Sequence, residues 1–204
     1  PERILAELQR LVRGEHADAA IATLKSVPLL RPWAAEGQPP APADTEGMSK
    51  EEIAVALPLA RLTALISDDG MIQLRASRAL RQRCERLRFW QQRTGLAPEC
   101  LPETDRLRLH DELERDLPAL ALQLPMPEKE IWLRRWRDAD DPLFHPRAPI
   151  DGNSLLKALE MQPGPLLGRL LHHLKLERAF KRIQTTTEAI EEAKHFLTRE
   201  SEAL

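Results

Sequence analysis

Five arginines in one segment are the side chains of this sequence best suited to hold a ligand. Residues 72–93 are expected to form one long helix, on which these arginines cluster on an arc beside the apolar face. Only Glu85 is available within the segment to pair with them, so the arc is either a solvated face with local salt bridges or a track for phosphates. The arginines are Arg75, Arg78, Arg83, Arg86 and Arg93.

A second group of candidate residues lies in the stretch MQPGPLLGRLLHHLKL, residues 161–176. Pro165 suits the first turn of a helix, and the leucines that follow fall on one face. Gly168, Arg169 and Lys175 fall on the opposite face. A glycine in a helix interior costs about 1 kcal/mol, so close approach of a phosphate or of a backbone would justify Gly168. The alternative is a glycine that packs where two helices cross.

Known catalytic groupings are not found. The sequence has no Gly-x-Ser-x-Gly, no Gly-rich loop before a Lys and no His-Glu-x-x-His. Cys84 and Cys100 form neither a disulfide framework nor a zinc motif, which makes a reducing cytoplasm the expected compartment. Trp132 and Trp136 lie one turn apart, and we expect them to be buried against a neighbouring helix rather than to stack on bases.

Composition and charge allow a helical protein with one basic block. The chain has 204 residues, 30% of them charged, and no apolar run approaches the roughly 18 residues of a membrane span. The formal net charge is −2, but residues 61–93 carry eight basic and three acidic side chains. Such a local patch, rather than the overall charge, is what would hold a polyanion. No initiator Met or signal-peptide pattern is present, so we expect Pro1 to be a processed or cut end.

Nearly every periodic segment predicts a helix. The expected fold is an elongated all-α array of about eight to ten helices without significant sheet. We expect three parts: a neck-like segment with a Pro-rich loop, a helical body and a helical tail, over residues 1–48, 49–124 and 125–204. The expected helices are 2–13, 17–26, 49–66 with a kink or split at Pro58, 72–93, 103–123 with a break at Pro118, 127–138, 153–160, 164–182 and 186–199.

Four stretches in order resemble the region that follows the catalytic head in bacterial-type (class II) tRNA nucleotidyltransferases and poly(A) polymerases. PERILAELQRLV with AIATLKSVPLLRPWAAE resembles the family's neck, and ARLTALISDDG resembles its body helix ending in Leu-Leu-His-Asp-x-Gly. IDGNSLLKALEMQPGPLLGRLL is similar to the tail element with Pro-Gly-Pro-x-x-Gly, and TTTEAIEEAKHFL to the closing helix. The order and spacing of these motifs carry the resemblance, which covers nearly the whole chain.

The resemblance implies a role in extending RNA 3′ ends with CCA or A. The family's chemistry uses two metal-binding carboxylates on a β-sheet head with a Gly-Ser element and an Asp-x-Asp pair, and neither is identified in this chain. The chain is therefore expected to be inactive alone and to hold tRNA through phosphate contacts. Mg²⁺ and nucleoside triphosphates would belong to the head, which is itself a partner if the chain is part of a longer protein. The implied RNA-binding residues are Arg75, Arg78, Arg83, Arg86, Arg93, Gly168, Arg169 and Lys175.

One position departs from the family pattern. Ser67-Asp68 stands where related members keep His-Asp, so a metal site for phosphohydrolysis could not be completed and no such activity is expected. The competing hypothesis is a stand-alone helical scaffold that binds protein through exposed helix faces and the Pro-rich loop 31–48. That scaffold would have a partner or dimer interface and no dependence on RNA.

Overall fold

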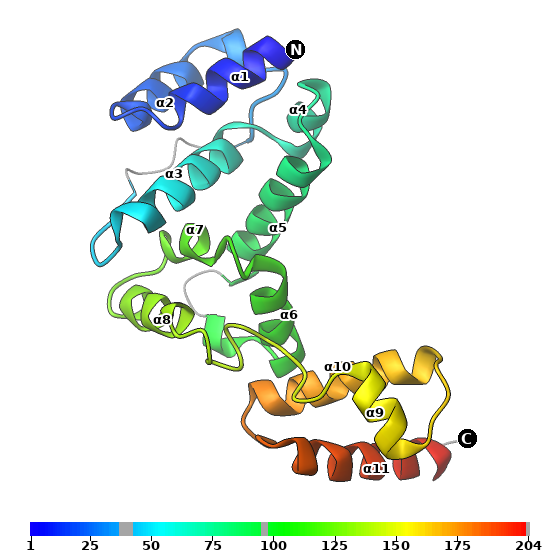
Figure 1. The fold of residues 1–204 in the computed structure, drawn as a ribbon. Coiled ribbons are helices and arrows are strands. Elements are labelled where there is room, and N and C mark those ends of the chain that lie inside the picture. Colours follow the sequence, from blue (N-terminus) through cyan, green and yellow to red (C-terminus); the bar gives the residue numbers. More distant parts are fainter. Residues whose placement is uncertain (37–42, 95–97, 203–204) are drawn as a thin grey trace. The chain divides into compact units, whose positions relative to one another are not determined.

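The computed structural model describes residues 1–36, 43–94 and 98–202 (Figure 1). In this part of the chain the regular structure is eleven α-helices and two short 3₁₀ helices. The described residues contain no strand beyond an isolated antiparallel bridge between Ala34 and Ile66. The predicted all-α class is confirmed. Part of the predicted Pro-rich loop lies outside the described residues.

The chain forms two compact units, and each is described separately. The first comprises Pro1–Pro98 and Glu112–Arg137, and the second comprises Glu99–Asp111 and Asp138–Leu204. The division into neck, body and tail that the sequence suggests stays a prediction.

Seven α-helices and a 3₁₀ helix build the first unit. They are α1 (Glu2–Leu11), α2 (Ala17–Ser26), η1 (Pro28–Leu30), α3 (Lys50–Leu65), α4 (Asp68–Gln73), α5 (Arg78–Thr94), α7 (Leu117–Ala121) and α8 (Glu128–Arg137). The second unit holds most of α6 (Glu103–Leu113) together with α9 (Gly152–Leu159), α10 (Pro165–Ala179) and α11 (Thr186–Glu202). The 3₁₀ helix η2 (Pro98–Cys100) includes the point in the sequence, between Pro98 and Glu99, at which the first unit gives way to the second.

Helix α3 is the centre of the first unit, where it packs against α5 and α7. It begins with the capping box expected from the sequence: Ser49 Oγ accepts from Glu52 N at 3.2 Å, and Glu52 Oε2 accepts from Ser49 N at 2.7 Å. Of the kink or split predicted at Pro58, the split is wrong, because α3 continues through the proline as one helix, and the kink stays a prediction. Burial of Ala56 and Leu59, on either side of the proline, offsets the one helical hydrogen bond that Pro58 cannot donate.

The predicted helix over residues 72–93 is two helices, α4 and α5. Arg75 adopts a left-handed conformation with φ 58°, and Ala76 N donates to Met71 O at 2.9 Å, as in a Schellman motif. Ser77 Oγ then accepts from an amide in the first turn of α5 at 3.3 Å. The apolar periodicity continues across the end of α4 and the start of α5, so it does not show this boundary, which is set by local capping.

The predicted helix over residues 103–123 is also two helices, α6 and α7. The break falls before α7 rather than at Pro118, which occupies the first turn of α7. A proline is tolerated there because its missing N–H would have no partner within the helix.

The backbone at the start of α4 lies close to the backbone that follows η1, at the carbonyl oxygen of Trp33. Ser67 N donates to this oxygen at 2.8 Å and Ser67 Oγ at 3.2 Å, while the same hydroxyl accepts from Gly70 N at 2.9 Å. A Cβ at Gly70 would lie 2.2 Å from Trp33 O, so only glycine fits. In the Ser-Asp-Asp-Gly stretch, Ser67 thus caps α4 and also donates to the backbone of the segment after η1, which packs directly against Gly70.

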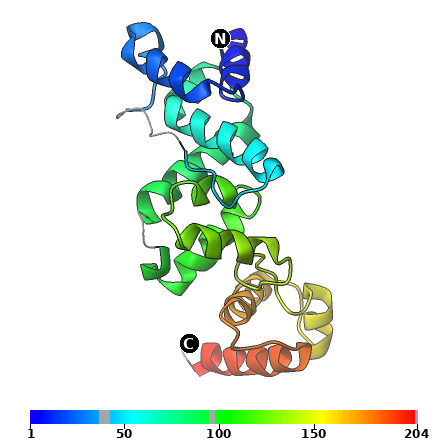
Figure 2. The ribbon, with the colours of Figure 1, turned by 90° about the vertical axis from the view of Figure 1, so that its left-hand side faces the viewer.

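In the second unit, α9, α10 and α11 surround an apolar core (yellow to red in Figure 2). Leu170 and Leu174 of α10 are fully buried, which confirms the predicted apolar face of this helix. Asp151 caps α9 by accepting from the amides of Asn153 and Ser154 at 3.0 Å. The buried members of the core are Ile150, Leu155, Leu170, Leu174, Ile183, Ala189 and Ala193.

Two glycine-to-alanine substitutions should affect stability in opposite directions. Gly70→Ala is expected to lower the free energy of unfolding of the first unit by about 2–4 kcal/mol, because its methyl group meets a backbone carbonyl. Gly168→Ala should raise the stability of the second unit by up to about 1 kcal/mol, because nothing lies within 4 Å of the added Cβ. All four tryptophans lie in the first unit, so denaturation followed by tryptophan fluorescence reports the first change and circular dichroism the second. Equal stability of Gly70→Ala and the parent protein would contradict the packing argument.

Candidate nucleic-acid interface

Helix α5 turns one face to the core of the first unit and the other to solvent. Cys84, Leu87 and Trp90 are fully buried on the inner face. The outer face carries residues spaced by three or four positions, which therefore follow one another along the helix. We call this row the exposed stripe; it consists of Arg78, Gln82, Arg86, Phe89 and Arg93.

Two arginines of the exposed stripe keep their charge available. Arg78 and Arg86 are exposed, and neither makes an ion pair with any residue that the structure describes. Arg93 is exposed on the same face. Glu85 is the single acidic residue of α5, so the charge of Arg78 and Arg86 is open to an anionic ligand.

Arg83 has a partner inside the protein. Its Nη2 and Nε donate to the carboxylate of Asp116 at 2.6 and 2.9 Å, and the Asp116 side chain is only 8% exposed. This bidentate bond raises the pKa of the Arg83 guanidinium above its ordinary value. The pair ties α5 to the start of α7, and the structure does not bring Arg83 into the exposed stripe. Its predicted RNA contact stays a prediction.

Arg75 is not on the arginine helix, contrary to the sequence-based expectation. It lies in the left-handed turn between α4 and α5, and its Nη1 donates to Glu2 Oε1 at 2.9 Å. Both side chains are more than 60% exposed, so the pair contributes little to stability.

The tail candidates lie on the outer face of α10. Gly168 is exposed, and no atom beyond its chain neighbours and the backbone of its own helix lies within 4 Å of the position of a Cβ, so the alternative that it packs at a helix crossing is wrong. Arg169 pairs with Glu200 at 2.7 Å, and Lys175 pairs with Asp111 at 2.9 Å. These pairs are partly exposed, so a phosphate would compete with a carboxylate for each cation. Helix α10 belongs to the second unit and α5 to the first, and each surface is described by itself.

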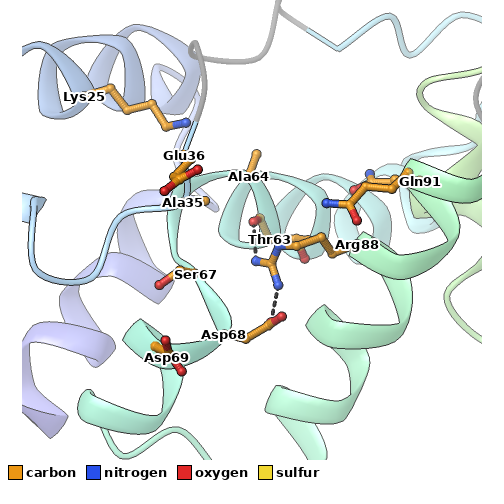
Figure 3. Close-up of a pocket in the computed structure, with 11 residues that line it drawn as sticks. Lys25, Ala35, Glu36, Thr63, Ala64, Ser67, Asp68, Asp69, Arg88 and Gln91 are labelled. Atoms are coloured by element: carbon orange, nitrogen blue, oxygen red, sulfur yellow. Dashed lines mark hydrogen bonds and ion pairs between the residues drawn. The ribbon is translucent and has the colours of Figure 1, made fainter.

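Arg88, which the sequence analysis did not select, spans the floor of a pocket of about 580 Å³ (Figure 3). Its Nη2 donates to Thr63 O at 2.7 Å and Ile66 O at 2.6 Å, and its Nη1 bonds the carboxylate of Asp68. These bonds satisfy carbonyls at the end of α3. Glu36, Lys25 and further polar side chains line the same pocket, and its charge is mixed rather than uniformly basic.

No chemical centre comes together in the described part of the chain. The Ser67 hydroxyl is used as a cap and as a donor to the backbone. An Asp-x-Asp sequence does occur, contrary to the sequence analysis, at Asp138 and Asp140, but it forms a turn in which Asp138 Oδ1 accepts from Asp140 N at 3.1 Å. Among the described residues, no three side chains of the metal-binding types lie close enough to share an ion.

The aromatic residues divide between the core and the exposed stripe. The predicted burial of Trp132 is confirmed at 4% exposure, and Trp136 is half-buried with its Nε1 donating to Glu114 O at 2.6 Å. Phe89, which the sequence analysis missed, is 40% exposed. The sequence shows that Phe89 lies among arginines, but its exposure depends on which face of α5 packs against the core.

Comparison with protein families, curated proteins and solved structures finds no match to this chain. The resemblance to nucleotidyltransferases therefore stays a prediction that rests on the quoted motifs. None of the helices that the structure describes is both long and apolar enough to cross a membrane.

Replacement of Arg83 should reduce stability. Arg83→Ala leaves the buried Asp116 carboxylate without its bidentate donor, and we expect the free energy of unfolding to fall by about 1–3 kcal/mol. This is less than for a fully buried pair, because Arg83 itself is 44% exposed. Arg86→Ala is the matched control and should stay within about 0.5 kcal/mol of the parent protein. Chemical denaturation followed by tryptophan fluorescence measures both. A double substitution, Arg83→Ala with Asp116→Ala, should cost less than the sum of the single changes, and strict additivity would argue against the pair.

Proposed function

We propose that this chain is the RNA-binding helical region of a tRNA nucleotidyltransferase or poly(A) polymerase whose chemistry is performed by a separate catalytic head. The observation that carries this proposal is the exposed stripe of α5, where Arg78 and Arg86 present guanidinium groups without a carboxylate partner among the described residues. The motif order described above supplies the enzyme class.

The spacing of the exposed stripe suits a polyanion. Arg78, Arg86 and Arg93 follow one another at about 12 and 10 Å along the helix axis, at 1.5 Å per residue. A row of cations at such intervals can contact several phosphates along one RNA backbone. If all three bind phosphates, the affinity should fall with salt with a slope of about −2 to −3 in log K against log salt concentration.

The outer face of α10 is proposed as a second phosphate contact. Gly168 leaves the helix surface open, which allows a backbone or phosphate to approach closely. Arg169 pairs with Glu200, and such an exposed pair contributes little to stability. A phosphate can therefore replace the Glu200 carboxylate and accept charge-assisted hydrogen bonds from the guanidinium. Lys175 would make the same exchange with Asp111 as its competing partner.

The proposal assigns catalysis to other residues. Mg²⁺ and the nucleoside triphosphate would bind the catalytic head, and the present chain would bind and orient the RNA, so that it is inactive alone. Cytoplasmic tRNA or another RNA 3′ region is the proposed partner.

RNA binding tests the proposal directly. The full chain should bind fluorescently labelled tRNA with micromolar or tighter affinity at low salt and more weakly as salt rises. Arg78→Ala with Arg86→Ala should weaken binding by about 10- to 30-fold and reduce the salt slope by about 2, because two phosphate contacts are lost. Fluorescence anisotropy at several salt concentrations measures both quantities.

The control variant is Arg10→Ala, which removes an exposed arginine that is paired with Glu7 on α1. Its affinity for tRNA should stay within twofold of that of the parent chain. Absence of tRNA binding at low salt would contradict the proposal for this chain. An oligomer or protein complex that forms independently of RNA, seen by light scattering, would instead favour the scaffold hypothesis.

A further inference from the structure

We propose that Phe89 is a stacking platform for an unpaired base, and that the exposed stripe therefore takes a single-stranded segment of RNA. This inference rests on the proposed function and assigns part of that surface a specific ligand, a nucleotide without a pairing partner. The observation behind it is an aromatic ring exposed to solvent in the middle of an arginine row.

Phe89 stands apart from the other aromatic residues. It is the only phenylalanine or tryptophan in the described part of the chain that is exposed, at 40%, whereas Trp90 beside it is fully buried. The ring of Phe89 contacts the buried Trp90 and still presents part of its surface to solvent among the arginines. Base stacking is a function that needs such a ring in contact with water in the free protein.

The ring of Phe89 is held in place before any ligand arrives. It stands almost perpendicular to the indole of Trp90, with 4.9 Å between ring centroids and an interplanar angle of 84°. Trp90 is itself fixed, because it is buried and its Nε1 donates to Glu112 Oε2 at 2.8 Å. A ring supported by a fixed neighbour loses less conformational freedom when a base stacks on it.

Arginines flank Phe89 along the exposed stripe. Arg86 lies three positions before it and Arg93 four positions after it, which places them about 4.5 and 6 Å away along the helix axis. A base on the ring would bring its own phosphate and a neighbouring one within reach of these side chains. The positive charge selects a nucleic acid over an apolar protein surface, and the ring selects an accessible base face.

Only an unpaired nucleotide offers both a phosphate for the arginines and an accessible base face for Phe89. In a duplex the base faces are covered by their neighbours, and proteins reach them chiefly in single strands, loops and ends. Stacking uses the face of a base rather than its edge, so it should tolerate any base. The expected ligand is a single-stranded RNA segment of no fixed sequence.

Two RNA probes separate stacking from phosphate binding. One is a short single-stranded RNA that contains 2-aminopurine, and the other is a blunt RNA duplex of the same length. Phe89→Ala should weaken binding of the single strand about 5- to 100-fold, and should abolish the change in 2-aminopurine fluorescence, because the stacking partner is lost. Its affinity for the duplex should stay within twofold of that of the parent chain.

Further variants distinguish stacking from apolar contact and from misfolding. Phe89→Trp should keep both the affinity and the fluorescence change, whereas Phe89→Leu should behave as Phe89→Ala although it retains an apolar side chain. Ile72→Ala, which truncates a 55% exposed apolar residue of α4, is the matched control and should not alter binding of either RNA. Circular dichroism and thermal unfolding verify that each variant is folded.

The outcomes also separate this inference from the proposed function. If Phe89→Ala binds the single strand as tightly as the parent chain while Arg78→Ala with Arg86→Ala does not, stacking is wrong and RNA binding stands. If Phe89→Leu is equivalent to the parent chain, the contact is apolar and not a stack. If the parent chain binds no RNA but forms an oligomer that depends on Phe89, the surface is a protein contact and both proposals fail.

Discussion

The docking of the Trp33 carbonyl onto the start of α4 is the constraint on which the first unit depends. One oxygen accepts from both the amide and the hydroxyl of Ser67, and the absence of a side chain at Gly70 allows it to come that close. The same serine caps α4, so the end of α3, the segment after η1 and the direction of α4 are set together. The left-handed Arg75 then ends α4, and α5 begins in a direction that its periodicity alone does not determine.

The arginines of the first unit have two kinds of role. Arg83 and Arg88 make short bonds to a carboxylate and to backbone carbonyls, and Arg61 does the same toward Asp18 and Val12 O. A planar guanidinium with five donors suits such internal bridges, which hold α5 and α3 in place. The arginines of the exposed stripe instead face solvent. The basic character of the segment is thus partly structural and partly available for binding.

The second unit shows a similar division on a single helix. The leucines of α10 bury their side chains in the core, while the opposite face carries an open glycine and two cations in partly exposed ion pairs. Because such pairs contribute little to stability, they keep the cations oriented at small cost and leave them exchangeable. The proposed RNA contacts in the two units therefore differ. On α5, Arg78 and Arg86 have no carboxylate partner among the described residues, whereas on α10 a phosphate would have to displace a carboxylate from each cation.

The sequence by itself determined the fold class, most helices, the capping box of α3 and the apolar face of α10, because these depend on periodicity and on contacts within one turn. It also identified the arginine-rich segment. Tertiary structure decided which arginines are available: Arg83 has a distant partner in Asp116, Arg75 belongs to a turn, and Arg78 and Arg86 stay exposed. It also decided that Gly70 meets a backbone while Gly168 meets none. The turn at Arg75 is set by local capping, but the other outcomes depend on residues far apart in the chain. No local pattern shows which of two similar residues will find a distant partner.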